Sequence, residues 1–395
     1  MKILLVHNYY RSGSPGGEDV VFEQERALLE GAGHEVVSYT RHNDEMQEGR
    51  IGDALKVLAG LQHSKRTQRE LHELIARKRP QVAHFHNTFP LVSASGYTAC
   101  ATAGVPIVQT VHNYRAVCAS ANHFRSGAVC EACTAGRPWA AVRHGCYRNS
   151  RAASFAVARM IRANARPRSP RESIGRYLAL THFAARRLIE AGVPAARIVV
   201  KPNFVDLSRL PQGLAGAPEG ASPYAVFSGR LSAEKGVETL IRAWAGVSGL
   251  SLKILGDGPE RARLEARARA EELPVEFLGM RPREEALQIV ARARCQIVPS
   301  EWFEGMPMVA LEAWALGVPL IAAKIGGLEE MLGEAERGLA FAPGDARALA
   351  ACVARLQGDP ALALRLIGNG RQALAAHRPE ASLAILEDTY RSLIG

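Results

Sequence analysis

The chain has 395 residues, more than one typical hydrophobic core holds, so its length predicts two domains. Hydrophobic residues make up 47% and charged residues 22%, as in an ordinary globular protein, and no apolar run reaches the roughly 18 residues of a membrane-spanning helix. Because no secretory leader precedes the first apolar run, we expect a cytoplasmic protein. In that setting the seven cysteines are reduced or bind a metal, and do not form a disulfide framework.

The net charge of +10 is concentrated in the first half of the chain. Residues 1–200 contain 27 Lys and Arg against 15 Asp and Glu, whereas residues 201–395 contain 22 against 24. Residues 148–187 alone contain ten arginines and one acid, with Phe155, Val157, Met160 and Ile161 interleaved. The pattern fits a peripheral, amphipathic segment on an anionic membrane surface, or a solvated arginine-rich surface. No nucleic-acid partner is expected, because no helix-turn-helix, finger or aromatic platform accompanies the charge.

Strands and helices alternate along both halves. In the first half, strands are predicted at residues 2–6, 34–39, 81–85, 105–111, 177–181 and 197–201, with apolar helical patterns between most of them. This order is typical of a parallel α/β sheet. A Gly- and Pro-rich stretch at 211–223 precedes a second alternation that starts at Tyr224, so we place the domain boundary near residue 205.

A glycine-containing loop, residues 7–18, follows the first predicted strand and leads into a helix from about Asp19. The loop is not Gly-x-Gly-x-x-Gly, and Thr40-Arg41-His42 stands where a dinucleotide-binding domain has an acid at the end of the second strand. An NAD-linked oxidoreductase is therefore disfavoured.

Three histidines lie at or near predicted strand ends in the first half. His112 ends the strand at 105–111, where its imidazole is placed to donate to a sugar hydroxyl or to stabilise developing charge. A lone histidine is more often structural. His84 and His86 occupy alternate positions of one strand and so share a face, with His86 nearer the strand end.

A cysteine-rich insertion comes directly after His112. Its four thiols, Cys118, Cys130, Cys133 and Cys146, include a central Cys-x2-Cys and suit a tetrahedral structural zinc site with no open position for catalysis. His123 or His144 would serve as a substitute ligand. The other interpretations are a cluster of buried, reduced thiols and an oxidisable pair. The remaining cysteines, Cys100, Cys295 and Cys352, lie in apolar periodic contexts typical of a core.

In the second half, a strand at Val226 leads into a turn containing Gly229 and two cations, Arg230 and Lys235. The glycine allows close backbone approach, and the cations suit a diphosphate. An ordinary strand-to-helix turn with solvated charged side chains would show the same residue pattern. A second strand, residues 252–255, ends in a similar turn with Gly256 and Gly258, and Gly326-Gly327 precedes a later helix.

Two glutamates stand after the strand predicted at Cys295–Pro299. Glu304 lies in a loop and Glu312 on the helix that the loop opens, with Pro307 in its first turn. Glu304 can accept hydrogen bonds from hydroxyls and Glu312 from a ribose diol, while free amides near residues 305–308 favour an anion. Alone, two glutamates at this spacing are more often a helix cap and a residue on a solvated helix face.

The order of these motifs resembles the retaining glycosyltransferases of family four (group 1), which have the GT-B fold. The resemblance covers nearly the whole chain and implies that Arg230 and Lys235 bind the donor diphosphate, Glu304 the donor sugar and Glu312 the ribose. It implies a contact of His112 with the donor sugar, and acceptor or phosphate contacts of the first loop, for which we choose Gly16 and Gly17, with Glu18 as a further candidate. The remaining donor-site residues that we assign are Gly229, Gly256, Gly258, Gly305, Met306, Pro307 and Met308. Asn203 and Asp206 resemble the family's residues between its domains, or cap that turn.

The expected architecture is α/β, with two Rossmann-like parallel-sheet domains facing a central cleft. Residues 1–204 form the acceptor-side domain with the cysteine-rich insertion at 113–150, residues 205–380 bind the nucleotide sugar, and residues 381–395 form a helix packing back on the first domain.

The expected reaction moves a hexosyl group from a nucleoside diphosphate sugar to an acceptor hydroxyl; retention at the anomeric carbon comes from the resemblance alone. No catalytic cofactor is expected, and since no Asp-x-Asp motif stands at a strand end, cationic side chains replace a metal ion. The expected acceptor is a glycan or a lipid-linked sugar in cell-envelope polysaccharide assembly, and a soluble metabolite is the alternative. A sugar-nucleotide epimerase of the same fold and a catalytically silent binding protein are the alternatives from other classes.

Overall fold

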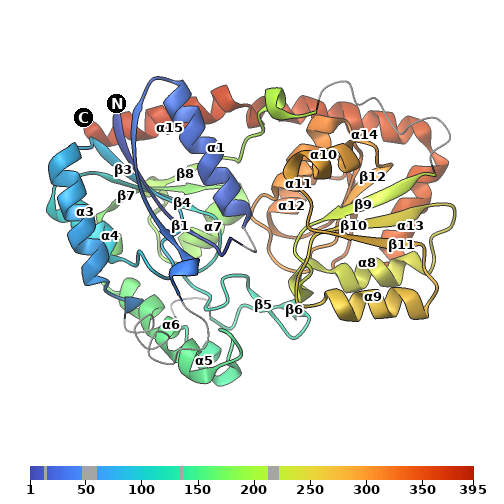
Figure 1. Ribbon diagram of the computed structural model, residues 1–395, viewed down its shortest axis with the longest axis horizontal. Coiled ribbons are helices and arrows are strands. Elements are labelled where there is room, and N and C mark those ends of the chain that lie inside the picture. Colours follow the sequence, from blue (N-terminus) through green and yellow to red (C-terminus); the bar gives the residue numbers. More distant parts are fainter. Residues whose placement is uncertain (13–15, 47–59, 134–136, 212–221) are drawn as a thin grey trace. The chain divides into compact units, whose positions relative to one another are not determined.

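The protein, described by a computed structural model, consists of two compact units (Figure 1). The first comprises Met1–His123, Cys130–Lys201 and Ser382–Gly395, and the second comprises Phe124–Val129 and Pro202–Ala381. The structure describes all residues except 13–15, 47–59, 134–136 and 212–221. Most of the stretch at 211–223, which we interpreted as the boundary between two alternations, therefore lies outside the described residues.

A six-stranded parallel sheet forms the centre of the first unit, in the order β2-β1-β3-β4-β7-β8. All six strands predicted from the first half are present, at β1 (Lys2–Tyr9), β2 (Glu35–His42), β3 (Val82–Phe85), β4 (Ile107–Val111), β7 (Ile174–Ala179) and β8 (Ile198–Val200). The parallel α/β class predicted from the sequence is confirmed.

Helices cover both faces of this sheet, because successive residues of β1 point to opposite sides. Ile3 and Leu5 pack with Phe22 of α1 (Gly17–Gly31) and with Tyr390 of α15 (Pro379–Ile394). Leu4 and Val6 belong to the other cluster, which includes residues of α3 (Lys65–Lys78), α4 (Ser95–Thr102) and α7 (His182–Glu190). Residues 3–6 of the strand are thus buried and read as a continuous apolar run.

A smaller apolar cluster lies beneath α5 (Ala140–His144) and α6 (Arg151–Asn164). Val157, Met160 and Ile161 of α6 pack in it with Leu61 and Cys133. Three of the four apolar residues interleaved in the basic segment are therefore core residues, and these three side chains do not face a membrane surface. A side-chain cap starts the helix, since the Ser150 hydroxyl accepts a hydrogen bond from a backbone N–H of the first turn.

The second unit repeats the architecture, with a parallel sheet in the order β11-β10-β9-β12-β13-β14. Its strands are β9 (Tyr224–Ser228), β10 (Ser251–Leu255), β11 (Val275–Gly279), β12 (Cys295–Val298), β13 (Leu320–Ala323) and β14 (Leu339–Phe341). Its helices are α8 (Val237–Trp244), α9 (Arg261–Ala270), α10 (Arg283–Ala291), α11 (Met308–Leu316), α12 (Gly326–Leu332), α13 (Ala346–Gly358) and α14 (Pro360–Ala373). The predicted pair of Rossmann-like parallel sheets is therefore present.

One element of the cysteine-rich insertion does not group with its neighbours in the chain. The short antiparallel hairpin of β5 (Phe124–Arg125) and β6 (Ala128–Val129) belongs to the second unit by its contacts, although the residues on both sides of it belong to the first. Within the described part of the chain, no helix has both the length and the apolar composition needed to cross a bilayer.

Candidate active site

The loops that follow β9, β10 and β12 meet at the carboxyl edge of the second sheet. The Leu231 N–H donates to the Asp257 carbonyl at 2.9 Å, which ties the loop after β9 to the turn after β10. The Glu301 N–H donates to the Glu234 carbonyl at 2.9 Å, and the Gly327 N–H to the Glu304 carbonyl at 2.8 Å. The loops singled out in the sequence are thus adjacent in space.

Lys235 and Glu304 form an ion pair within this group of loops. The Lys235 Nζ lies 2.7 Å from Glu304 Oε1, and the same oxygen accepts hydrogen bonds from the Ser300 hydroxyl at 2.6 Å and from the Trp302 indole at 2.8 Å. The Lys235 ammonium also lies 4.9 Å from the centre of the Trp302 ring. Among the described residues, no partner is recorded for Glu304 Oε2, so that oxygen remains available to a ligand hydroxyl.

The helix that carries Glu312 starts one residue after the proline. Pro307 is the N-cap of α11, not a residue of its first turn, and the backbone N–H groups that follow it begin the helix at Met308. Glu312 is buried and forms an ion pair with Arg283 at the start of α10, at 2.7 Å. A ribose diol bound by Glu312 would therefore share its carboxylate with a guanidinium.

The glycines of these loops are required by close packing of one loop on another. A Cβ on Gly256 would lie 1.9 Å from the Gly229 carbonyl oxygen, and one on Gly258 would lie 2.4 Å from the Leu231 carbonyl oxygen. Gly256 also has a φ of +129°. Sequence reasoning assigned Gly229, Gly256 and Gly258 to the ligand, whereas the structure gives at least the last two a structural role. Arg230, between these turns, is exposed.

In the first unit, His112 is the end of a buried chain of polar groups. Its Nε2 lies 3.0 Å from His86 Nδ1, and His86 Nε2 lies 3.1 Å from Glu25 Oε1. Lys201 Nζ pairs with the other Glu25 oxygen at 2.8 Å, and all three side chains of Glu25, His86 and Lys201 are inaccessible to solvent or nearly so. Glu25 and Lys201 were missed by sequence reasoning. The available signal was an acid at a position where the pattern of Val21, Phe22 and Leu29 on α1 calls for an apolar residue.

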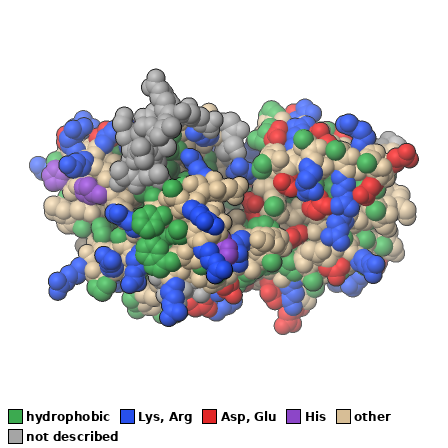
Figure 2. Space-filling view, turned by 90° about the horizontal axis from the view of Figure 1, so that it is seen from below, with side chains coloured by type: hydrophobic (Ala, Val, Ile, Leu, Met, Phe, Trp, Pro, Cys, Tyr) green, Lys and Arg blue, Asp and Glu red, His purple; other side chains and the backbone are tan. Residues whose placement is uncertain are grey.

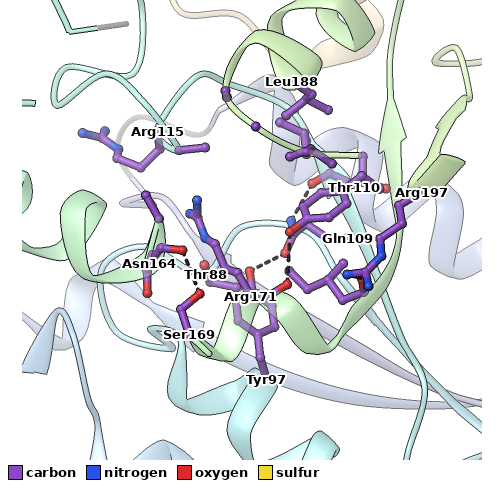
Figure 3. A pocket seen from close by; sticks show the side chains of 18 of the residues that line it. Thr88, Tyr97, Gln109, Thr110, Arg115, Asn164, Ser169, Arg171, Leu188 and Arg197 are labelled. Carbon is purple, nitrogen blue, oxygen red and sulfur yellow. Dashed lines mark hydrogen bonds between the residues drawn. The ribbon is translucent and has the colours of Figure 1, made fainter. Parts of the chain in front are cut away.

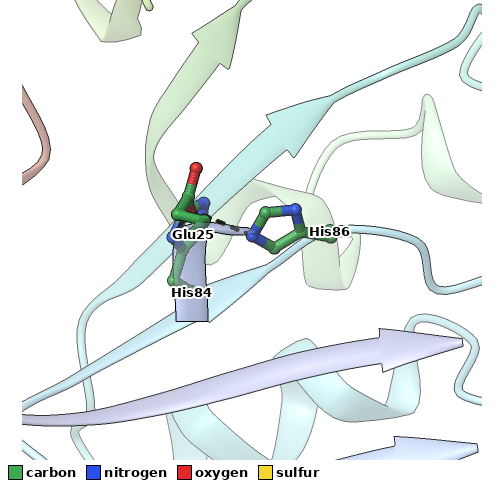
Figure 4. Close-up of side chains that lie close together, drawn as sticks. All are labelled: Glu25, His84 and His86. Atoms are coloured by element: carbon green, nitrogen blue, oxygen red, sulfur yellow. Dashed lines mark hydrogen bonds and ion pairs between the residues drawn. The ribbon is translucent and has the colours of Figure 1, made fainter. Parts of the chain in front are cut away.

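Glu25, His84 and His86 place one possible metal ligand each within 4.8 Å of one another (Figure 4). Lys201 already neutralises the Glu25 carboxylate, and His84 forms hydrogen bonds with the Tyr390 and Thr110 hydroxyls, each at 2.7 Å. A cation would have to displace an ammonium from a buried site. Among the described residues, the set is therefore a buried network whose charge the Lys201 ammonium compensates, and not a metal centre.

This network determines the protonation of His112. Burial by itself raises the pKa of Glu25, but Lys201 and the two histidines outweigh it and hold that pKa well below its usual value. The ionised carboxylate only accepts, so His86 donates from Nε2 and accepts at Nδ1 from His112 Nε2–H. Burial lowers the pKa of His112 well below its ordinary value. His112 is thus neutral with Nδ1 as a free acceptor. In this tautomer His112 would accept a hydrogen bond from a sugar hydroxyl at Nδ1 instead of donating one, and its contact with the donor sugar stays a prediction.

The first loop supports the start of α1. Gly16 is the N-cap, and its N–H donates to the Asp19 carboxylate at 3.0 Å, while Gly17 is the first helical residue. A Cβ on Gly16 would lie 2.6 Å from the Tyr10 ring, whereas one on Gly17 would meet nothing within 4 Å. The carboxyl group of Glu18 accepts a hydrogen bond from the Asn113 amide at 2.5 Å, next to His112. Burial raises the pKa of Glu18.

A cavity of about 650 Å³ opens beside His112 within the first unit (Figure 3). His86, His112, Asn113 and Glu18 line one part of it. Its remaining wall comes from β4, α4, the end of α6, and the segment from Ser169 to Arg197.

The four cysteines of the insertion lie near one another. Burial, together with the smaller effect of the neighbouring thiol groups of Cys118, Cys146 and Cys130, raises the pKa of the Cys133 thiol to about 11. Among the described residues, which include all seven cysteines, no disulfide is formed. Among the described residues, the four thiols are not part of a set whose ligand atoms all lie within 4.8 Å, and the zinc site expected from their spacing stays a prediction.

Asn203 and Asp206 differ in their surroundings. The Asn203 side chain donates to the Met306 carbonyl at 3.0 Å, just before α11, while the Asn203 backbone carbonyl accepts from the His377 ring at 3.0 Å. The Asp206 carboxylate caps a short 3-10 turn by accepting from the Ser208 N–H. Asp206 therefore has the capping role, and Asn203 holds the Met306 backbone.

Known proteins match both halves of the chain. The model of Glycosyltransferase Family 4 matches residues 15–209, and that of Glycosyl transferases group 1 matches residues 216–373. A glycogen synthase of Mycobacterium tuberculosis is 35% identical over 191 residues, 47% of this chain and 46% of that protein. WcaL of Escherichia coli, named a putative colanic acid biosynthesis glycosyltransferase, is 31% identical over 186 residues, 44% and 45% of the two chains. The chain spans about half the length of these relatives.

The fold as a whole matches a solved structure, HepE from Anabaena in complex with UDP, with a TM-score of 0.68, 20% identity and all of both chains covered. At that identity the likeness concerns the fold alone. Together with the matches of both halves to the two family models, it shows that the chain belongs to the group 1 glycosyltransferases and has the GT-B fold.

Proposed function

We propose that the protein transfers a hexosyl group from a nucleoside diphosphate sugar to an acceptor hydroxyl, with retention at the anomeric carbon. The observation that carries this proposal is the Lys235–Glu304 pair, in which a cation and a carboxylate with one free oxygen lie together at a sheet's carboxyl edge. Such an edge is where open α/β sheets bind nucleotides. The chain's membership of the group 1 glycosyltransferases and the UDP in the HepE complex support a nucleotide-sugar donor.

The chemistry assigned to these groups is electrostatic. As the bond from the anomeric carbon to the diphosphate oxygen breaks, negative charge grows on the leaving group, and Arg230 and Lys235 supply fixed positive charge there. The acceptor oxygen bonds to the same face of the sugar, and its proton passes to the departing diphosphate. Glu304 Oε2 accepts from a hydroxyl of the transferred sugar.

We assign the acceptor to a lipid-linked sugar of cell-envelope polysaccharide assembly. The name of WcaL, a polysaccharide biosynthesis relative, supports this class. A cavity beside His112 in the first unit favours transfer over epimerisation, because an epimerase needs no room for a second substrate. The neutral His112 would accept a hydrogen bond from a substrate hydroxyl at Nδ1.

An exposed aromatic pair supports a peripheral position on an anionic membrane surface. Trp139 and Phe155 are each 47% exposed, and their ring centres lie 6.0 Å apart. Five exposed arginines surround them in the sequence: Arg143, Arg148, Arg151, Arg159 and Arg162. Figure 2, seen from the side on which α5 and α6 lie in Figure 1, shows hydrophobic side chains among Lys and Arg on this face. Aromatic rings with adjacent cations suit the boundary between headgroups and acyl chains.

We also propose a structural zinc ion on Cys118, Cys130, Cys133 and Cys146. What supports it is the proximity of four thiols with a Cys-x2-Cys core. The apolar cluster beneath α5 and α6 already orders part of the insertion, so zinc would add to existing packing.

The test of the proposed function has two steps. A thermal-shift panel of nucleoside diphosphates, nucleotide sugars and NAD(H) should show a higher melting temperature with one base series, because a ligand that binds only the folded state stabilises it. The donor so identified is then incubated with candidate acceptors, and the anomeric configuration of the product is read by NMR. A response to NAD(H) alone, or an inverted product, would contradict the proposal.

A further inference from the structure

Four arginines line the cavity of the first unit: Arg115, Arg166, Arg171 and Arg197. The acids in the described lining are Glu18 and Glu172. Glu18 is buried with a raised pKa, which favours its neutral form, and Glu172 is on the exposed side. The cavity therefore carries a surplus of positive charge.

None of these four guanidinium groups forms an ion pair with a carboxylate among the described residues. This differs from the arginines of α9, where Arg261, Arg263 and Arg267 each pair with at least one acid. Arginines on a protein surface with acids nearby ordinarily acquire such partners. The cavity arginines face a space of about 650 Å³ instead.

Two of the four guanidinium groups are already held in place. Arg115 donates to the Ala119 carbonyl, and its guanidinium carbon lies 4.3 Å from the centre of the Phe89 ring. Arg197 donates to the Glu172 carbonyl at 3.0 Å. Neutral carbonyls and rings orient these cations without neutralising them. A ligand anion would therefore find charge that is fixed before it binds, which lowers the entropic cost of binding.

Arg171 lies at the centre of the cavity, near a polar floor (Figure 3). Its charge lowers the pKa of Tyr97 and of Tyr177 against the larger effect of burial, which raises both. The Tyr97 hydroxyl donates to Gln109 at 2.5 Å, and the Gln109 amide donates to two backbone carbonyls at 2.6 Å each. Because the floor is satisfied internally, the unpaired cations above it are what a ligand would engage.

The number of arginines in the cavity indicates which kind of anion it would bind. One carboxylate carries a single negative charge and would leave three guanidinium groups uncompensated, whereas a diphosphate carries two or three charges on several oxygens in the geometry that guanidinium forks match. Leu188, Val193 and Pro194 form an apolar wall next to these cations. The cavity thus combines a phosphate-binding side with an apolar side.

We propose that this cavity binds a phosphate or diphosphate group of the acceptor substrate, so that the acceptor is a phosphorylated molecule. The inference deepens the proposed function and rests on it, because only that function identifies the phosphorylated molecule as the acceptor. It assigns Arg171 and Arg197 as specificity-determining residues, and it places the phosphate on the same side of the first unit as His112.

The test uses the full chain with Arg230→Ala and Lys235→Ala, which removes the cations of the second unit. Calorimetric titration with inorganic pyrophosphate should show binding in this background. Addition of Arg171→Gln or Arg197→Gln should weaken it at least tenfold, corresponding to about 1.4 kcal/mol. Arg69→Gln, the same change on an exposed residue of α3 outside the cavity, should leave it unchanged. Arg166→Gln, on an exposed residue of the lining, replaces either variant if that variant fails to fold.

Two further ligands identify the source of the phosphate. Farnesyl diphosphate should bind more tightly than pyrophosphate if a prenyl chain uses the apolar wall, and glucose 1-phosphate should bind more tightly if the acceptor is a soluble sugar phosphate. No pyrophosphate binding, binding that ignores the arginine variants, or equal binding of citrate would overturn the proposal. Nucleotide binding by the wild-type chain is measured separately, so a failure of the proposed function is recognised on its own.

Discussion

At the scale of single residues, the neighbours of a side chain decide what it can do. Lys235 and Lys253 have similar exposure, at 25% and 29% of the side chain, and each lies over an aromatic ring. Only Lys235 contacts a buried carboxylate in a loop at the sheet's edge. His112 was chosen as a donor, yet the chain from Glu25 through His86 makes it an acceptor.

Lys235→Ala should reduce transfer by about 100-fold, because one fixed cation facing the leaving diphosphate is lost. The fold should survive, since Ser300 and Trp302 still donate to Glu304. Lys253→Ala, with its comparable exposure and ring contact, should retain near-wild-type turnover. The measurement is kcat/KM with the donor identified by thermal shift, and equal activity of the two variants would refute the role of Lys235.

Acidification should destabilise the first unit through its buried histidines. Burial lowers the pKa of His86 to about 4, so the folded state keeps His86 neutral while the unfolded chain binds a proton below about pH 6.5. Unfolding therefore takes up a proton, and the free energy of unfolding falls as the pH falls from 6.5 toward 4. From pH 7 to pH 5 the loss from His86 is about 2 kcal/mol. The lowered pKa of Glu25 acts in the same direction, but mainly below about pH 4.5.

The check is urea unfolding at pH 7 and pH 5 of the wild type and of His86→Gln. The variant is less stable at pH 7, but its loss on acidification should be smaller by about 2 kcal/mol. His72→Gln, on an exposed residue of α3, serves as the control and should lose as much as the wild type. An identical loss in His86→Gln would show that His86 does not titrate as described.

At the scale of elements, loop packing sets which residues a strand-to-helix turn can contain. The turns after β9 and β10 approach so closely that a carbonyl of one occupies the space of a side chain on the other. Glycine at these positions therefore has a structural explanation that holds with or without a ligand. The cysteine-rich insertion differs from these turns, because thiol groups and apolar side chains pack there in one small cluster.

Gly256→Ala should destabilise the second unit by about 2–3 kcal/mol, because its Cβ would meet the Gly229 carbonyl and its φ of +129° suits only glycine. Gly344→Ala provides the comparison, since Gly344 also has a positive φ, +79°, but open space around the added methyl group. That variant should lose about 1 kcal/mol. Urea unfolding measures both, and equal losses would mean that the close contact relaxes at no cost.

If zinc occupies the insertion, Cys130→Ser with Cys133→Ser should lower the melting temperature of the first unit, and chelation should do the same to the wild type. Structural zinc binds tightly enough to survive purification, so metal analysis should find about one equivalent per chain. Cys100→Ser, a buried thiol on α4, is the control for loss of a thiol alone. Less than about a fifth of an equivalent would end the zinc proposal.

At the scale of the whole molecule, the charge is divided between the halves of the chain. The first half holds the surplus of arginines, and the structure uses them in two ways: around the Trp139–Phe155 pair and around the cavity beside His112. The second half is nearly neutral, and many of its arginines pair with acids on α9 and neighbouring segments.

Liposome flotation should show binding to anionic vesicles that weakens with salt, because surface charges are screened within about 8 Å at physiological ionic strength. Trp139→Ser with Phe155→Ser should reduce recovery several-fold at low salt. Leu364→Ser, on the most exposed large apolar residue of the second unit, should not. Equal recovery with neutral vesicles would remove the electrostatic argument.

The sequence by itself determined the fold class, the strand positions and the family of this protein. Runs such as Ile3–Val6 are apolar at every position because both faces of a parallel sheet are covered. This pattern is visible in the local sequence without knowing which segments cover the two faces. The motif order around Arg230, Lys235, Glu304 and Glu312 depends on the chain alone, since each motif is a single strand-to-helix turn.

Only the tertiary structure decided which side chains meet. Glu25, His86 and Lys201 are separated by 61 and 115 positions in the chain, and Arg171 and Arg115 by 56, so no local pattern joins them. Their pairing depends on strand order, which places β1, β3 and β4 side by side and brings α1 and the end of β8 to the same buried site. Among the described residues, the same folding left the four cavity arginines without an ion-paired carboxylate, which makes their charge available to a ligand.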